Sequence, residues 1–377
     1  MKSILLFEDV YGLFGGIEKV INNIIENADP EEFSFSLCVN HMASDEYLPF
    51  LKEHHVKIFE LENYWGKNPI KRHLAGYKAF RVFLKSHSFD IIHFHISNSI
   101  DLKYIAIAKK AGFPIRIAHC HNDEATSSAK RIMHKFLKPF NVKKATYNVA
   151  CSDKAGRWLY TKKIMKSDSY KTIPNGIPTC RFAFSAENRE LFRKEFGASD
   201  KTLMVMHVGR FNKQKNQAKA ISAFEIVHKE KPDSKLVFFG AGDKTSLRNF
   251  VLEQGLSDSV IFHPPVTNVN EYYSAFDCFV FPSLYEGFGI VVVEAETNGL
   301  HCVLADTIPS FVVFGTSVST LPLLASDTEW AKEILSSPIG NRKDNVSLAQ
   351  EKGFDQKEQA KAIYCIYREE LARIGRK

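Results

Sequence analysis

The stretch KTIPNGIPTCRFAFSAE, residues Lys171–Glu187, interrupts a pattern that fills the sequence on either side of it. On both sides, short apolar runs rich in branched residues alternate with segments of helical periodicity; IRIAHCH precedes the stretch and KLVFFGAGD follows it. The stretch itself holds two prolines and an Asn-Gly pair, which favour turns. Strands that alternate with helices are typical of a parallel sheet covered on both faces. The sequence therefore predicts two α/β domains joined near this stretch.

We place the two domains at 1–176 and 177–353, followed by a charged helix at 354–377. Both domains are expected to be Rossmann-like and to face a central cleft. Ligands of such sheets bind beyond the carboxyl ends of the strands, so candidate site residues should follow the predicted strands.

Composition excludes several classes of protein. No run approaches the ~18 apolar residues of a membrane span, and the apolar start turns acidic at Glu8, too early for a signal peptide. The seven cysteines are scattered without a C-x-x-C pair, which favours free thiols over disulfides or zinc. These features predict a cytoplasmic protein.

Positive charge is concentrated in the N-terminal part. Residues 1–180 hold 26 Lys and Arg against 18 Asp and Glu, whereas the remainder holds 24 against 25. Solvated helix faces would explain this excess, and so would a surface that meets a phosphorylated acceptor or anionic lipid at the inner face of a membrane. No nucleic acid partner is predicted, because the aromatic residues among these charges have the helical spacing of core residues. The basic residues singled out are Lys67, Lys71, Arg72, Lys78, Arg81, Lys130, Arg131, Lys135 and Lys138.

Two histidine pairs lie at the ends of predicted strands, His93 with His95 and His119 with His121. A spacing of two places both members of a pair on one face of a strand. The second member of each pair should reach the ligand edge. Such pairs can chelate a metal, but no nearby cysteine or carboxylate completes a ligand set, so no metal site is predicted.

The first strand is followed by Gly15-Gly16 and then by a predicted helix, where backbone N–H groups favour an anion. The pattern is not G-x-G-x-x-G, and the second strand ends in Asn40 rather than in an acidic residue. Both features argue against a nicotinamide-dependent dehydrogenase.

In the second half, HVGRFNKQKN places Arg210 and Lys215 just past a strand. A planar guanidinium and a compact ammonium group together suit a diphosphate. Gly240 ends the next strand, and backbone groups of Thr267 to Val269 should lie at the end of the strand after it.

The stretch SLYEGFGIVVVEAETNGL, Ser283–Leu300, carries Glu286 and Glu294. We predict a helix over Gly289–Asn298, because Asn298-Gly299 is a helix stop, although its three valines would also suit a strand. Eight helical positions span about 12 Å, comparable to the distance from the hexose to the ribose of a nucleotide sugar.

These motifs together give a resemblance to a known family. SLYEGFGIVVVEA resembles the E-x7-E signature of the retaining glycosyltransferases with the GT-B fold, called glycosyl transferases group 1. GRFNKQKN looks like the family's phosphate-binding G-R-x-x-x-x-K-N, and FGGIEKV, RIAHCHN and IPNGI match other landmarks in order. The resemblance covers about residues 1–310 and leaves 311–345 without a landmark.

The resemblance implies a GT-B fold in which the C-terminal helix crosses back to the N-terminal, acceptor-binding domain. It implies transfer of a hexose, with retention and without a metal or cofactor, from a UDP-sugar or similar donor held by the C-terminal domain. The acceptor would be a glycan or a lipid-pyrophosphate-linked sugar of bacterial capsule, exopolysaccharide or lipopolysaccharide synthesis. Alternatives are a nucleotide-sugar epimerase, a non-catalytic partner subunit and a phosphorylase.

Roles carry over by position. Arg210 and Lys215 would hold the diphosphate, Glu286 the hexose hydroxyls and Glu294 the ribose hydroxyls. The histidine that contacts the transferred sugar falls at His121 or His119. The remaining donor-binding residues implied are Gly15, Gly16, Gly240, Thr267, Val269, Gly287, Phe288, Gly289 and Ile290.

Overall fold

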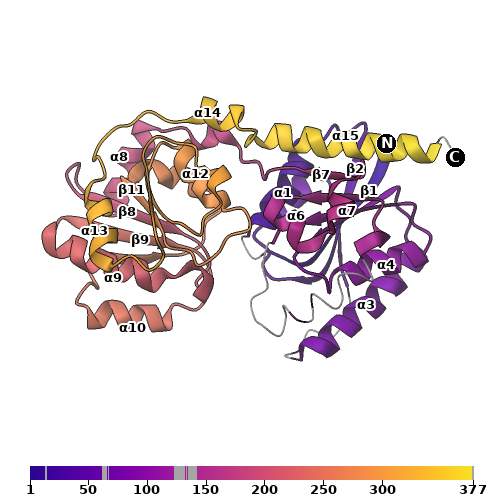
Figure 1. Cartoon of the computed structure of the whole chain (residues 1–377), viewed down its shortest axis with the longest axis horizontal. Helices are drawn as coiled ribbons and strands as arrows, with labels where there is room; N and C mark the ends of the chain where they lie inside the picture. Colours follow the sequence, from indigo (N-terminus) through magenta and orange to yellow (C-terminus); the bar gives the residue numbers. More distant parts are fainter. Residues whose placement is uncertain are drawn as a thin grey trace. The chain divides into compact units, whose positions relative to one another are not determined.

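The computed structural model describes residues 1–12, 15–61, 66, 68–122, 132, 134 and 142–375. The chain forms two compact units (Figure 1). The N-terminal unit comprises Met1–Gly176 with Gln356–Lys377, and the C-terminal unit comprises Ile177–Asp355.

A seven-stranded parallel sheet forms the centre of the N-terminal unit, in the order β3-β2-β1-β4-β5-β6-β7. The strands are β1 Lys2–Tyr11, β2 Phe33–Met42, β3 Lys57–Glu60, β4 Ile91–Ile96, β5 Ile115–Cys120, β6 Tyr147–Ala150 and β7 Tyr170–Thr172. Every residue of β4 and β5 is buried, as the apolar runs predict for central strands.

The helices of this unit are α1 Gly16–Glu26, α2 Leu48–Glu53, α3 Pro69–Ser86, α4 Leu102–Lys110, α6 Asp153–Leu159, α7 Lys162–Met165 and α15 Gln356–Gly375, with the 3-10 turn η1 Val142–Lys144. Helices α1 and α15 share one core with the sheet. In that core Tyr364 of α15 stacks on Phe33, with ring centroids 5.3 Å apart. The charged C-terminal helix is thus part of the N-terminal unit, although 179 intervening residues separate it from the rest in sequence.

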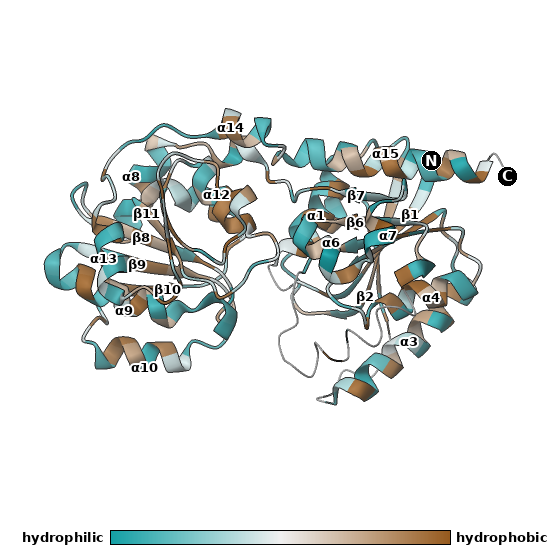
Figure 2. Ribbon diagram, in the orientation of Figure 1, coloured by the Kyte–Doolittle hydropathy of each residue, from teal (hydrophilic) through white to brown (hydrophobic). Residues whose placement is uncertain are grey.

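The C-terminal unit holds a six-stranded parallel sheet in the order β10-β9-β8-β11-β12-β13. Its strands are β8 Leu203–Val208, β9 Ser234–Phe239, β10 Val260–His263, β11 Cys278–Phe281, β12 His301–Ala305 and β13 Val318–Leu321. Its helices are α8 Ala186–Glu195, α9 Gln217–Glu230, α10 Thr245–Glu253, α11 Val269–Tyr272, α12 Ile290–Thr297, α13 Asp327–Leu335 and α14 Val346–Glu351. Four 3-10 turns complete it: η2 Thr179–Phe182, η3 Lys213–Lys215, η4 Tyr273–Ala275 and η5 Ser310–Val312. Figure 2 shows the strands of this sheet predominantly in the brown of hydrophobic residues.

A buried ion cluster attaches α8 to this sheet. Asp277 lies immediately before β11, and its carboxylate oxygens are 2.7 Å from the Arg189 guanidinium and 3.1 Å from that of Arg193. The backbone N–H of Met204 on β8 also donates to Asp277 at 3.0 Å. A fully buried carboxylate needs several such donors, so this cluster fixes α8 against the starts of β8 and β11.

The α/β class and the parallel sheets are confirmed. Two strands, β7 and β13, were not predicted, because each is short and polar and only a sheet neighbour defines it. Strand β13 lies in 311–345, the segment without a landmark, and pairs with β12 from Cys302↔Val318 to Ala305↔Leu321. Within the described residues, no helix is both long and apolar enough to cross a membrane.

Candidate functional site

The loops after β8 and β11 meet at an ion pair. Lys215 ends η3, and its Nζ lies 2.6 Å from Oε1 of Glu286. Ser283 donates its hydroxyl to the same carboxylate oxygen at 2.6 Å. The Lys215 and Glu286 side chains are 15% and 9% exposed, so the pair is largely shielded from water and oriented before any ligand binds.

Backbone contacts make these two loops one rigid feature. Leu284 donates its backbone N–H to the carbonyl of Gln214 at 2.8 Å, and Gln214 Nε2 donates to the carbonyl of Tyr285 at 2.8 Å. Asn216 follows with φ 52° and ψ 43°, a left-handed conformation that asparagine tolerates. The sequence predicted the two loops separately; their mutual bonding is a tertiary feature.

Arg210 also lies in the loop after β8, as predicted. Its side chain is exposed, while its carbonyl accepts a hydrogen bond from Gln217 Nε2 at 2.9 Å. Among the described residues, no carboxylate forms an ion pair with its guanidinium. The backbone is therefore held in place and the charge remains available to an anion.

Gly240 stands at the end of β9, where two loops approach closely. A Cβ at this position would lie 2.1 Å from the carbonyl oxygen of Gly209, so packing alone requires glycine here. Gly242, at φ +122°, is in a conformation that also favours glycine. Of the residues predicted to offer backbone groups, Thr267 precedes α11 and is exposed, and Val269 is the first residue of α11.

The predicted helix over Gly289–Asn298 is confirmed as α12. Gly289 is its N-cap at φ 87° and Asn298 its C-cap. Phe288 is turned into the core, with ring centroids 5.4 Å from Phe311 and 6.0 Å from Phe354. That anchor positions the first turn of α12, whose N–H groups favour an anion.

Glu294 lies within α12 and is fully buried. The hydroxyl of Tyr273 donates to Glu294 Oε2 at 2.8 Å, and burial together with this carboxylate holds the pKa of Tyr273 well above its ordinary value. A ribose could reach Glu294 only if neighbouring side chains moved. The sequence reading did not include Tyr273 or Ser283, because only the fold brings them to the glutamates.

In the N-terminal unit, Gly15 and Gly16 begin α1 as expected. Glu18 occupies this helix start: its Oε2 accepts the backbone N–H of Gly15 at 3.0 Å. A phosphate at this helix start would therefore have to displace the buried Glu18 carboxylate.

The two histidines of each pair share one face, as the spacing of two predicts, and the register of β4 with β5 brings the two pairs together. Ring centroids are 4.4 Å apart for His93 and His95 and 4.2 Å apart for His119 and His121. Burial lowers the pKa of His121 to about 3 and that of His93 to about 3, and it holds the pKa values of the other two well below the ordinary range. All four are neutral at neutral pH. His119 has no exposed surface, whereas His121 is 7% exposed, which favours His121 as the residue that meets a substrate.

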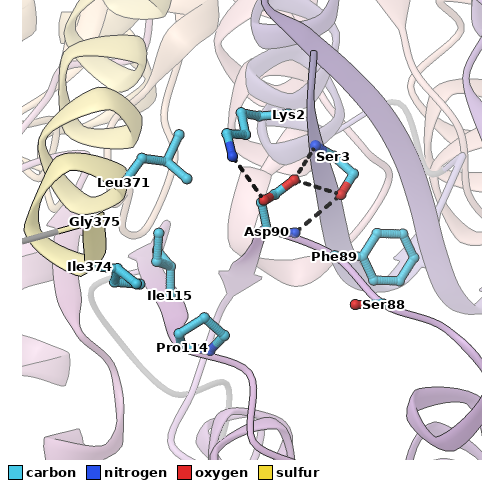
Figure 3. Close-up of a pocket in the computed structure, with 10 residues that line it drawn as sticks. All are labelled: Lys2, Ser3, Ser88, Phe89, Asp90, Pro114, Ile115, Leu371, Ile374 and Gly375. Atoms are coloured by element: carbon cyan, nitrogen blue, oxygen red, sulfur yellow. Dashed lines mark hydrogen bonds and ion pairs between the residues drawn. The ribbon is translucent and has the colours of Figure 1, made fainter. Parts of the chain in front are cut away.

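A hollow of about 420 Å³ lies elsewhere, at the amino ends of β1 and β5. Figure 3 shows Asp90 at its wall, where Ser3 donates its backbone N–H to Asp90 at 2.8 Å and Lys2 lies 3.4 Å away. Leu371 of α15 also lines it. Ligands of parallel sheets bind at the opposite, carboxyl edge, and this hollow contains none of the predicted site residues.

Two family sequence models match the chain. The model described as Glycosyltransferase Family 4 matches residues 14–181, and that described as Glycosyl transferases group 1 matches residues 188–315. Both confirm the resemblance seen in the sequence.

Named relatives agree with these matches. The chain is 26% identical over 366 residues to EpsF of Bacillus subtilis, named as a glycosyltransferase, covering 94% of this chain and 93% of that protein. It is 25% identical over 304 residues to the UDP-Gal:alpha-D-GlcNAc-diphosphoundecaprenol alpha-1,3-galactosyltransferase of Escherichia coli, covering 78% and 77%. Among solved structures, sucrose-phosphate synthase of Thermosynechococcus elongatus superposes with a TM-score of 0.76 at 16% identity, covering 99% of this chain and 100% of that one. The fold is GT-B, and both halves of the chain match glycosyltransferase families: Glycosyltransferase Family 4 in the N-terminal half and Glycosyl transferases group 1 in the C-terminal half.

Proposed function

We propose that this glycosyltransferase moves a hexose from a nucleotide diphosphate sugar, of the UDP-hexose class, to a glycan or a lipid-pyrophosphate-linked acceptor. The observation that carries the proposal is the Lys215–Glu286 pair, with Ser283 bonded to the same carboxylate, beside an exposed Arg210 in one rigid pair of loops. Such a site offers cations for a diphosphate and an oriented carboxylate for sugar hydroxyls.

Charge balance supports transfer without an added metal. The leaving diphosphate gains negative charge as the sugar departs, and preorganised cations stabilise that charge most effectively. Arg210 supplies a positive charge with no ion-pair partner among the described residues, Lys215 supplies a second that is paired with Glu286, and the N-terminus of α12 supplies a partial one. In this proposal those groups take the place that Mg²⁺ fills in many phosphoryl sites.

We propose that the configuration of the anomeric carbon is retained, because neither carboxylate is placed to act as a nucleophile. Glu286 is bonded to Lys215 and Ser283, so it is a positioning group rather than a nucleophile. The leaving phosphate would help to deprotonate the acceptor hydroxyl on the face from which it departs. His121 would contact the transferred sugar.

A lipid-linked acceptor is favoured by the surface of α3. This helix contains no Asp or Glu, and its exposed apolar residues Ile70, Leu74 and Val82 are 71%, 62% and 58% exposed. At 3.6 residues per turn these positions fall within an arc of about 120°. The exposed cations in the same arc are Lys71, Lys78, Arg81 and Lys85.

A face that mixes exposed apolar and basic side chains is suited to the surface of an anionic membrane. Figure 2 shows brown and teal residues alternating along α3. The E. coli relative is named for a diphosphoundecaprenol-linked acceptor, which points the same way. Of the other basic residues singled out in the sequence, Lys67, Lys130, Arg131, Lys135 and Lys138 lie outside the described residues.

The test is a screen of nucleotide sugars for binding and hydrolysis, followed by lipid-pyrophosphate-linked and soluble acceptors with the best donor. NMR of the new anomeric centre reports retention or inversion, and assays with EDTA report any need for added metal. Transfer that requires an acceptor supports the proposal. Conversion of the donor without any acceptor would identify an epimerase, and failure to bind any nucleotide sugar would favour a non-catalytic subunit.

A further inference from the structure

The histidine cluster of β4 and β5 leaves several buried nitrogens without a partner. The register places His95 beside His119, so the two pairs form one group. Among the described residues, no hydrogen-bond partner reaches Nε2 of His93, Nε2 of His95 or either nitrogen of His119. A buried polar atom left unpaired costs about 1–3 kcal/mol, so several in one place indicate a missing ligand.

The other nitrogens of two of these rings are already held. Nδ1 of His93 lies 2.7 Å from the hydroxyl of Tyr367 on α15, and Nδ1 of His95 lies 3.0 Å from Nε2 of His121. With the proton on Nδ1 in both rings, each Nε2 presents a lone pair. A histidine bound to a metal characteristically donates its second N–H to a neighbouring polar group in this way.

The geometry is close to that of a three-histidine site. One ring nitrogen from each of His93, His95 and His119 lies within 4.8 Å of the others. Two nitrogens on one tetrahedral zinc ion are about 3.4 Å apart when each bond is ~2.1 Å, so modest ring rotations bring the three together. The neutral imidazole is the ligating form of histidine.

We propose that His93, His95 and His119 bind one divalent transition-metal ion of the zinc class within the N-terminal unit, and that Tyr367 orients His93. Imidazole ligands favour zinc, cobalt, nickel or copper over magnesium or calcium. The ion would tie β4 to β5 and, through Tyr367, to α15, with a fourth position open to water.

The sequence alone predicted no metal site, because no nearby cysteine or carboxylate completes a ligand set. The structure shows that the neighbouring strand supplies a third histidine in the same place. The inference is independent of the proposed donor site in the C-terminal unit. If His119 holds the ion, His121 alone remains for the transferred sugar.

The test uses the full chain, stripped of metal by dialysis against a chelator and then titrated with Co²⁺ and with Zn²⁺. Elemental analysis of the untreated protein gives the resident metal. We expect one ion per chain, the visible d–d absorption of tetrahedral Co²⁺, and a Tm that rises with the concentration of added zinc. Failure of wild-type protein to bind a stoichiometric ion would overturn the proposal whatever the variants do.

Variants then assign the ligands. His119→Ala should abolish stoichiometric binding, with His93→Gln as the alternative if that protein does not fold. Tyr367→Phe should weaken Zn²⁺ affinity by about 10- to 100-fold, the usual effect of losing a group that orients a ligand. His301→Gln is the matched control, since His301 is a buried histidine of the other unit, bonded to Ser317 at 3.0 Å, and should bind as wild type does. Unchanged binding and spectrum in a folded His119→Ala or His93→Gln protein would also overturn the assignment.

Discussion

Lys215 and Glu286 lie 71 residues apart in sequence, yet their side chains form a 2.6 Å ion pair that links the loops after β8 and β11. Each residue was assigned to a different part of the donor, Lys215 to the diphosphate and Glu286 to the hexose. Their pairing means that the two subsites are coupled: a change at one alters the position or charge of the other. A donor that spans both subsites would meet side chains that are already ordered, which reduces the entropic cost of binding.

Replacing Glu286 tests the hexose end of this site. Glu286→Ala should lower the rate of transfer more than tenfold, as expected when a positioning contact to the reacting sugar is lost. It should also reduce the free energy of unfolding by about 1–3 kcal/mol, because Lys215 loses a partner in a mostly buried place. Transfer assays and denaturation by urea measure the two effects. Glu253→Ala, on the exposed surface of α10, is the control for charge, and unchanged turnover in a folded Glu286→Ala protein would remove Glu286 from the site.

The diphosphate subsite is tested by removing its cations. Arg210→Ala combined with Lys215→Ala should weaken binding of the bare nucleoside diphosphate, because both positive charges assigned to the phosphates are lost. Calorimetry gives the affinity directly, without requiring the acceptor. Lys213→Ala is a matched control, since Lys213 lies in the same turn as Lys215 but is exposed. An affinity equal to that of wild type in the double variant would contradict the assignment.

The sequence predicts those strands whose own residues form a recognisable apolar run. Strands such as β4 and β5 are buried on both faces and therefore rich in apolar branched residues, whereas β7 and β13 are short and acquire a strand conformation only from a neighbour. The spacing of the histidines predicts one face on each strand. It could not predict that His95 and His119 are neighbours in register, because strand order depends on the whole topology.

Contacts between distant segments were also beyond prediction at the candidate site. Sequence motifs located Arg210, Lys215 and Glu286 individually, since each follows a strand. The contacts of Ser283 and Tyr273 with the glutamates arise between segments distant in sequence or in a loop of irregular shape, and no periodic pattern encodes them. The contact of the Glu18 carboxylate with the start of α1 was not predicted either, because a glycine pair before a helix is equally compatible with an external anion and with a side chain of the helix itself.

Glu296 gives a prediction about pH. It is buried in α12, and Phe314 and Gly315 donate their backbone N–H groups to its Oε2 at 2.6 Å each. Burial outweighs these two bonds and raises the pKa of Glu296 from 4.5 to about 7. In the unfolded chain the carboxyl group ionises with its ordinary pKa of 4.5. At a pH between 4.5 and about 7, folding is therefore accompanied by uptake of a proton. The free energy of unfolding therefore falls as pH rises from about 4.5 to about 7 through this group.

Glu296→Gln removes that dependence while keeping an oxygen acceptor for the two N–H groups. Relative to wild type, the variant should gain stability between pH 5 and pH 8, by up to about 3 kcal/mol. Thermal or urea denaturation across this range measures the difference, with Glu190→Gln on the exposed surface of α8 as the control. A difference between Glu296→Gln and wild type that stays constant with pH would show that Glu296 is ionised in the folded protein throughout.

The exposed face of α3 predicts binding to anionic membranes. Each basic residue near such a surface contributes about 1 kcal/mol, screened over roughly a Debye length, and inserted apolar residues add to this. Co-sedimentation with vesicles should therefore increase with the fraction of anionic lipid and decrease with salt. Lys78→Ser combined with Arg81→Ser should weaken binding by about 30-fold, the equivalent of ~2 kcal/mol.

A charge-matched variant separates the surface of α3 from net charge alone. Lys109→Ser combined with Lys110→Ser removes the same two charges from the exposed end of α4, and it should bind vesicles nearly as wild type does. Leu74→Ser leaves the charge intact and should weaken binding at high salt, where only the apolar contribution remains. Equal losses in the two double variants would indicate that overall charge, rather than α3, attracts the protein to lipid. Binding that ignores both lipid charge and salt would rule out the electrostatic attachment, even if transfer to a soluble acceptor is observed.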